Sequence, residues 1–136
     1  MSTILYGVSD DALERRPVAG KWSARENIAH LARYHEIFLQ RIERIRTEDN
    51  PRLERYRAEE DSEWAQWACK PAGEVLKALQ ALRLETVGVV EKLSDPELTR
   101  TAIHSRFGAM TLVQWLEFFL LHEAHHLFVA MQRARE

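Results

Sequence analysis

The sequence predicts an all-α protein, with residues 1–136 forming one domain built as a helical bundle. Glycine and proline, which interrupt helices, are scarce: there are five glycines and four prolines. Three long segments carry apolar residues at alternating spacings of three and four, the repeat of one face of an α-helix. Such amphipathic helices cannot bury their apolar faces alone, so we expect them to pack together.

The first long helix is predicted to begin after Ser23 and to end before Asn50 and Pro51. Ser23 is followed three residues later by Glu26, the capping-box pattern that satisfies free amides at a helix start. Proline disfavours helical geometry in the residue before it, which ends the helix. The residues of its inward face are Ile28, Leu31, His35, Phe38, Ile42 and Ile45. A weak helical stretch, residues 10–16, precedes it.

Turn-forming residues and apolar spacing also predict the bounds of the remaining helices. A short helix that carries Trp64 and Trp67 is expected to begin near residue 61 or 62. The second long helix has Pro71 in its first turn, where the missing N–H costs nothing, and ends at residues 94–96. Residues 97–110 are predicted as a connection with a short extended piece around 99–103, and the last long helix begins near Thr111.

Composition and charge exclude several classes of function. There are 19 basic and 21 acidic side chains, so the net charge of -2 gives no general attraction to nucleic acid. A local basic group, Arg52, Arg55 and Arg57, is interleaved with glutamates and indicates a solvated face. No apolar run approaches the roughly 20 residues of a membrane span, and no secretion signal is visible. One cysteine, Cys69, cannot form an internal disulfide, and we expect a cytoplasmic protein.

Histidines are concentrated in the last predicted helix. His122 and His126 are four residues apart, and an advance of about 100° per residue places both on the inward face, whereas His125 points towards solvent. Burying an imidazole without a partner costs on the order of 1–3 kcal/mol. A divalent cation removes that cost, because neutral imidazoles at this spacing can converge on one ion. The pair therefore predicts a metal site.

The third ligand of such a site has to come from upstream. Residues 122–126 match the H-E-x-x-H pattern of zinc peptidases, but those enzymes normally take a further ligand from downstream, where no histidine follows. His35 lies near the middle of the apolar stripe of the first long helix, and His30 lies at its edge. His104, in the predicted connection, is a third candidate. Helix periodicity mildly favours His35 and leaves the choice open.

Three segments resemble the DinB/YfiT-like superfamily. Residues 21–31, which include Trp22, Ser23, Glu26 and His30, are similar to that family's W-S-x-x-E-x-x-x-H-L motif. Residues 107–112 and 122–127 are similar to its F-G-x-x-T-L and H-x-x-H-H-L ending. The resemblance spans about residues 10–133.

The resemblance implies a four-helix bundle that holds one divalent ion, often nickel or zinc, with three histidines. Carried over by position, the ligands are His30, His122 and His126, and His125 matches a histidine that does not bind the metal. The resemblance thus favours His30 over His35 as the third ligand. The segment before the motif is too short for the family's full first helix, so the Trp64/Trp67 helix or a homodimer is expected to complete the bundle. Val129 stands where a glutamine is common.

The family also implies an activity. Its members include thiol S-transferases, a thiol-dependent isomerase and hydrolases, so we expect a metal-dependent enzyme acting on a small molecule, with a low-molecular-weight thiol as one candidate. Glu26, one turn before His30, is a candidate catalytic base or orienting group, although a helix-capping role is the simpler explanation for it. The alternative is a non-catalytic helical module in which the metal or the histidine cluster is structural. No nucleic-acid or membrane partner is expected.

Overall fold

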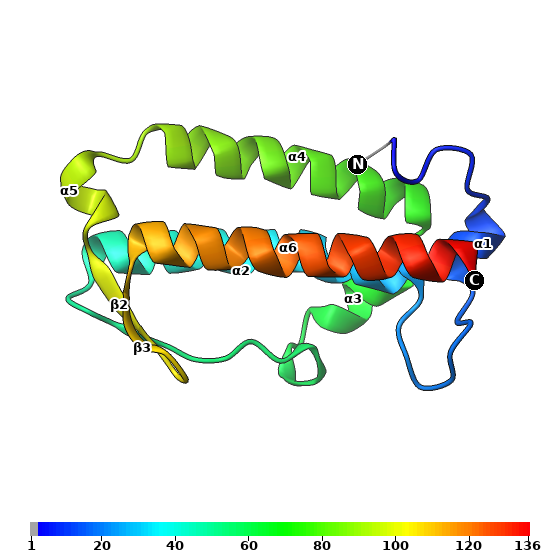
Figure 1. The fold of residues 1–136 in the computed structure, drawn as a ribbon, viewed down its shortest axis with the longest axis horizontal. Coiled ribbons are helices and arrows are strands. Elements are labelled where there is room, and N and C mark those ends of the chain that lie inside the picture. The colour runs from blue at the N-terminus through cyan, green and yellow to red at the C-terminus, as the bar shows by residue number, and fades with distance from the viewer. Residues whose placement is uncertain (1–2) are drawn as a thin grey trace.

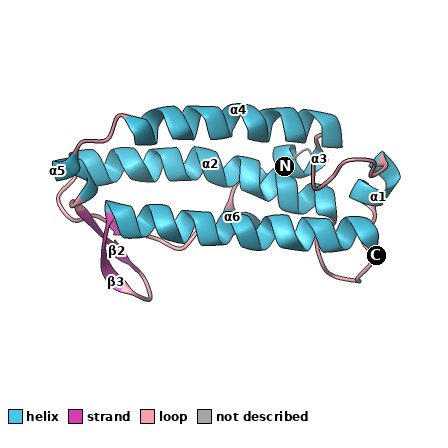
Figure 2. Cartoon of the chain, turned by 45° about the horizontal axis from the view of Figure 1, so that its top comes forward, coloured by secondary structure: helices cyan, strands magenta, loops and turns pink. Residues whose placement is uncertain are grey.

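Three long helices dominate the molecule, which a computed structural model describes over residues 3–136; the first two run in the same direction and the last runs antiparallel to them (Figures 1 and 2). They are α2 (Ala24–Thr47), α4 (Ala72–Glu91) and α6 (Leu112–Arg135). Helix α2 is central, since α4 and α6 both pack along it. The all-α class predicted from the sequence is confirmed, with one small sheet added.

Short elements occupy the place of a fourth long helix. Helix α1 (Asp10–Glu14) packs against α2, α4 and α6, and α3 (Trp64–Cys69) packs against α2. The side chains of Trp64 and Trp67 are partly buried against the apolar residues of α2 and α4. The short first helix and the contribution of the tryptophan helix to the bundle are therefore both confirmed.

Local capping sets the starts of the long helices. Ser23 and Glu26 form the predicted capping box at the start of α2, and Thr111 forms another with Gln114 at the start of α6. Pro71 is the N-cap of α4, one position earlier than the first-turn place predicted for it. The start of each long helix is determined by residues within three positions of it, and such local patterns can be recognised in the sequence.

The prediction of a connection over residues 97–110 is largely wrong. This region holds part of α5 (Asp95–Leu98), then β2 (Thr101–His104) and most of β3 (Gly108–Thr111). Strands β2 and β3 pair antiparallel, while β1 (Arg52–Leu53) pairs parallel to β2 with Arg52 opposite Ile103. A single turn of 3₁₀-helix, Ala58–Glu60, follows β1. The short extended piece expected around residues 99–103 corresponds to β2, while α5 and β3 were not expected.

The core divides into two apolar clusters along α2. The first includes Ile28 and Leu31 with Leu79 of α4, and the second includes Tyr34, Phe38 and residues of α6 such as Trp115. His30 lies on α2 among residues of the first cluster, one helical turn before Tyr34 of the second. The candidate site is therefore held from both sides by packed residues.

Large apolar side chains remain exposed on α4 and α6, among them Leu84, Val87, Leu120, Leu121 and Phe128. The homodimer expected from the short first helix stays a prediction. Within residues 3–136, no helix combines the length and the apolar character needed to cross a membrane.

Candidate metal centre

Three histidines from two helices meet inside the bundle. His30 comes from α2, and His122 and His126 come from successive turns of α6. Each offers one ring nitrogen, and these three atoms lie within 4.8 Å of one another. The Nε2 atoms of His30 and His122 are 3.1 Å apart although the residues are separated by 92 positions in the sequence. The packing of α6 on α2 therefore creates the cluster.

The other candidate histidines lie elsewhere. The ring of His35 lies between Thr86 Oγ1, at 2.8 Å, and Glu123 Oε1, at 3.0 Å. His104 Nδ1 accepts hydrogen bonds from the backbone N–H groups of the hairpin turn after it. His125 is exposed, as its position on the helix predicted. The structure thus brings His30, and neither His35 nor His104, to the α6 pair.

Burial keeps the three rings neutral. Desolvation, followed by the proximity of the other two histidines, lowers the pKa of His30 to about 2. Desolvation, followed by the proximity of His126, His125 and Arg41, lowers the pKa of His122 to about 3, and desolvation followed by the proximity of His125 lowers the pKa of His126 to about 4. Neutral imidazole is the form that binds a metal ion, because its free nitrogen carries a lone pair.

Asn27 determines which nitrogen of His126 faces the cluster. The amide Nδ2 of Asn27 donates to the backbone carbonyl of Ser23 at 2.8 Å, which turns its Oδ1 towards His126. This oxygen lies 2.9 Å from His126 Nδ1, so Nδ1 carries the hydrogen and donates it. The lone pair of His126 is then on Nε2. Such support from behind a ring commonly orients metal-binding histidines.

The hydrogen bonding of His30 and His122 is incomplete among the described residues. Their Nδ1 atoms are buried and have no hydrogen-bond partner within residues 3–136. Their Nε2 atoms face each other, so they either share one hydrogen or direct both lone pairs to a common cation. Two nitrogens bound tetrahedrally to one Zn²⁺ at 2.0–2.1 Å are about 3.4 Å apart. The spacing of the cluster and its all-imidazole donor set therefore fit a divalent ion such as zinc or nickel.

Aromatic rings enclose the cluster on the α2 side. The rings of Trp22 and Trp64 lie 5.1 and 6.1 Å from that of His30, and the Tyr56 ring stacks on it at 5.6 Å. The ring of Tyr34 lies 4.0 Å from that of His122. These side chains restrict water around the histidines. Tyr56 and Asn27 were not assigned to the site from the sequence, although Asn27 precedes His30 by one helical turn.

Both carboxylate oxygens of Glu26 have partners. Oε2 accepts from the backbone N–H of Ser23 at 2.7 Å and from Arg16 Nε at 2.9 Å, and Oε1 pairs with the same guanidinium. Burial raises the pKa of Glu26, but these hydrogen bonds and the charge of Arg16 outweigh it and lower the pKa overall. The geometry favours the capping role. A catalytic role for Glu26 stays a prediction.

Glu123, the glutamate of the H-E-x-x-H pattern, points away from the three histidines. It lies 3.0 Å from His35 Nε2 and accepts a hydrogen bond from Arg83 Nε at 2.8 Å. Desolvation opposes its ionisation, but these two partners lower its pKa overall. The arrangement differs from a peptidase of this pattern, in which the glutamate acts beside the metal.

Comparison with known proteins places the chain in a family. Residues 1–130 match the model of the DinB superfamily. YuaE of Bacillus subtilis is 26% identical over 136 residues, which cover 90% of this chain and 83% of YuaE. OB0782 of Oceanobacillus iheyensis, which bears the name "Putative metal-dependent hydrolase", is 26% identical over 129 residues, covering 93% of this chain and 73% of that protein.

A solved structure has a similar fold. YfiT from Bacillus subtilis, described as a probable metal-dependent hydrolase with an unusual four-helix bundle topology, aligns with a TM-score of 0.82. The alignment covers 98% of this chain and 77% of YfiT at 23% identity, so the likeness concerns the fold. With its family match over residues 1–130, this chain belongs to the DinB superfamily.

Proposed function

We propose that this protein is a metal-dependent enzyme that binds one divalent cation, nickel or zinc, through His30, His122 and His126 and hydrolyses a small-molecule substrate. The observation that carries the proposal is the convergence of three ring nitrogens within 4.8 Å. The descriptions of OB0782 as a "Putative metal-dependent hydrolase" and of YfiT as a "probable metal-dependent hydrolase" support the choice of reaction.

The residues of the chain would hold and shield such an ion. His126 would bind through Nε2, because Asn27 accepts the hydrogen of Nδ1. Trp22, Tyr34 and Tyr56 would limit the water that competes with a substrate, since their rings lie beside the histidines. A divalent ion bound by neutral ligands supplies Lewis acidity, which polarises a carbonyl and eases the ionisation of water or of a thiol. A low-molecular-weight thiol is therefore the second nucleophile that we propose, and it would make the enzyme a thiol S-transferase.

Metal content tests the ligand set directly. Protein purified without added metal would be compared with His30→Ala, His122→Ala and His126→Ala by elemental analysis, with His125→Ala as the matched control. We expect about one divalent ion per wild-type chain, loss in the three ligand variants and retention in the control, because His125 is exposed. Equal metal content in all five proteins would contradict the proposal.

Activity then separates an enzyme from a structural module. The metal-loaded wild type and the His30→Ala variant would be assayed against a panel of esters and amides, with and without low-molecular-weight thiols. Hydrolysis or thiol transfer that requires both metal and His30 supports the enzyme. A chelator that lowers the unfolding temperature, with no reaction across the panel, would favour the non-catalytic module.

A further inference from the structure

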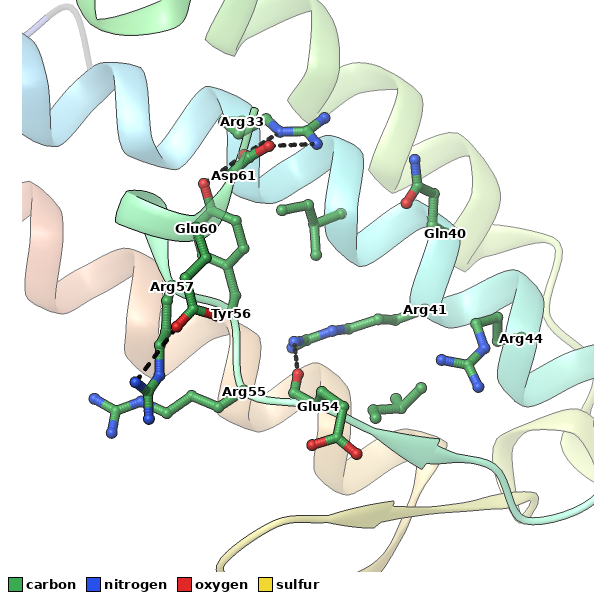
Figure 3. Close-up of a pocket in the computed structure, with 12 residues that line it drawn as sticks. Arg33, Gln40, Arg41, Arg44, Glu54, Arg55, Tyr56, Arg57, Glu60 and Asp61 are labelled. Atoms are coloured by element: carbon green, nitrogen blue, oxygen red, sulfur yellow. Dashed lines mark hydrogen bonds and ion pairs between the residues drawn. The ribbon is translucent and has the colours of Figure 1, made fainter. Parts of the chain in front are cut away.

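A second feature next to the histidines is a cavity of about 390 Å³ between α2 and residues 53–61 (Figure 3). We call it the arginine pocket, because five arginines line it together with Tyr56. These arginines are Arg33, Arg41, Arg44, Arg55 and Arg57. The volume lies within the range of about 300–1,000 Å³ that is usual for small-molecule sites.

Carboxylates neutralise three of these arginines. Arg33 pairs with Asp61 at 2.7 Å, Arg44 with Glu48 at 2.5 Å and Arg57 with Glu60 at 3.5 Å. Within residues 3–136, Arg41 and Arg55 have no carboxylate within 4.0 Å. Three carboxylates, Glu54, Glu60 and Asp61, also line the pocket, so its lining carries five guanidinium groups against three carboxylates, although the chain as a whole is slightly acidic.

Arg41 is the unusual member of the pocket, because it is a cation with only 9% of its surface exposed. Its guanidinium donates to Tyr34 Oη at 2.9 Å and to the backbone carbonyl of Glu54 at 2.7 Å. A guanidinium has five N–H donors, and this one makes two hydrogen bonds and lies 5.6 and 5.8 Å from the ring centres of Tyr34 and Trp115, with no carboxylate beside it in the described residues. A buried charge without a counter-ion is costly. An anion in the pocket would supply the missing partner.

The arginine pocket is adjacent to the histidine cluster. Tyr34, which accepts the hydrogen bond from Arg41, has its ring 4.0 Å from that of His122. Tyr56 lines the pocket, and its ring stacks on His30 at 5.6 Å. One layer of tyrosine rings thus separates the two features. Figure 3 shows Arg41 reaching from α2 towards the segment that carries Tyr56.

We infer that the arginine pocket binds the carboxylate or phosphate group of a small-molecule substrate, with Arg41 as its main contact and Arg55 at its rim. A planar guanidinium can donate two parallel hydrogen bonds to either group, which explains why the site suits an oxyanion. The identification of the bound molecule as the substrate rests on the function proposed above. The inference that the pocket binds an anion is independent of that function.

Anion titrations of the full chain test the inference. Inorganic phosphate and acetate would be titrated, in the presence of a chelator, into the wild type, Arg41→Gln, Arg55→Gln and the control Arg52→Gln, followed by nuclear magnetic resonance of the arginine Nε–H groups. Arg52 is exposed in the same segment but does not line the pocket. We expect shifts at Arg41 and Arg55, affinity at least tenfold weaker in Arg41→Gln, several-fold weaker in Arg55→Gln, and within twofold of wild type in Arg52→Gln. The anion that binds with the higher affinity identifies the group that the pocket prefers.

The outcomes separate this inference from the proposed metal site. His30→Ala should lose metal yet keep its affinity for phosphate or acetate. Circular dichroism would confirm folding, and Arg55→Gln removes an exposed side chain, so it tests the pocket even if Arg41→Gln fails to fold. Wild-type protein that binds neither anion, or variants of Arg41 and Arg55 that bind as the wild type does, would overturn the inference whatever the metal analysis shows.

Discussion

At the scale of single residues, Asn27 is the side chain whose position has the clearest chemical consequence. It is buried, and its two hydrogen bonds to Ser23 and His126 leave it one orientation. His126 therefore has its hydrogen on Nδ1 before any ion binds. The apolar side chain of Val129, three residues after His126, cannot provide a hydrogen bond, and Asn27 provides one from the other helix.

Replacing Asn27 by alanine should weaken the binding of a divalent ion about 10- to 100-fold, because the ring of His126 would lose its fixed tautomer and orientation. Competition with a coloured chelator would measure the affinity for zinc and nickel. His125→Ala is the control, since that side chain is exposed next to His126. An unchanged affinity in Asn27→Ala would show that the hydrogen bond has no role in metal binding.

The sequence could predict part of this arrangement. His122 and His126 were identified by their spacing, which any helix turns into a common face. Periodicity favoured His35 over His30, because both lie on the buried side of α2, at 2% and 5% exposure, and the inward face is too broad to separate them. The family motif indicated His30. Asn27 gave no signal, since its role depends on a helix 99 positions away in the sequence.

At the scale of elements, the start of α2 is held by two interactions of the same carboxylate. Glu26 closes the capping box with Ser23 and pairs with Arg16. The cap anchors the helix that carries His30, and the ion pair connects it to the chain segment after α1. Both interactions are structural and position the helix that carries His30, while a catalytic role for Glu26 stays a prediction.

Changing Glu26 to glutamine should lower the free energy of unfolding by about 1–2 kcal/mol, because the amide replaces a charged partner at the cap and at Arg16. Urea denaturation at pH 7 would measure the difference. If Glu26 only caps the helix, the refolded variant keeps its catalytic rate within about twofold. A loss of rate without a loss of stability would instead favour the catalytic role predicted from the sequence.

The long helices were predictable and the sheet was not, for a common reason. Caps and helical spacing are local signals, so the starts of α2 and α6 could be located within a residue. The pairing of β1 with β2 joins Arg52 to Ile103, and β1 has only two residues. No local sequence pattern specifies this pairing, because the contact between β1 and β2 depends on how the helices between them in the sequence pack.

At the scale of the whole molecule, the buried histidines link stability to pH. Their pKa values of about 2, 3 and 4 lie below the value of about 6.5 expected in the unfolded chain. Below pH 6.5 the unfolded chain therefore binds more protons than the folded one. The contribution of these histidines to the free energy of unfolding is therefore complete above about pH 6.5 and decreases as the pH falls towards 4.

In the presence of a chelator, the free energy of unfolding should fall between pH 6.5 and 5 by as much as about 1.4 kcal/mol per pH unit for each of the three histidines. Urea denaturation at pH 7.5, 6 and 5 would give the slope. His30→Gln should reduce this slope by the contribution of one histidine. The lowered pKa of His104 contributes equally to the slopes of both proteins. Identical slopes in the two proteins would contradict the neutral, buried state of His30.

The distance along the chain between His30 and the α6 pair has a consequence for how the protein acquires its ion. An ion shared by residues 92 positions apart acts as a removable cross-link, and closing so long a loop is entropically unfavourable until the bundle has already formed. Metal would thus be taken up by the folded chain and would not template it. Nascent chains that still lack the final helix would lack two of the three proposed ligands, so uptake of the proposed ion would follow completed synthesis.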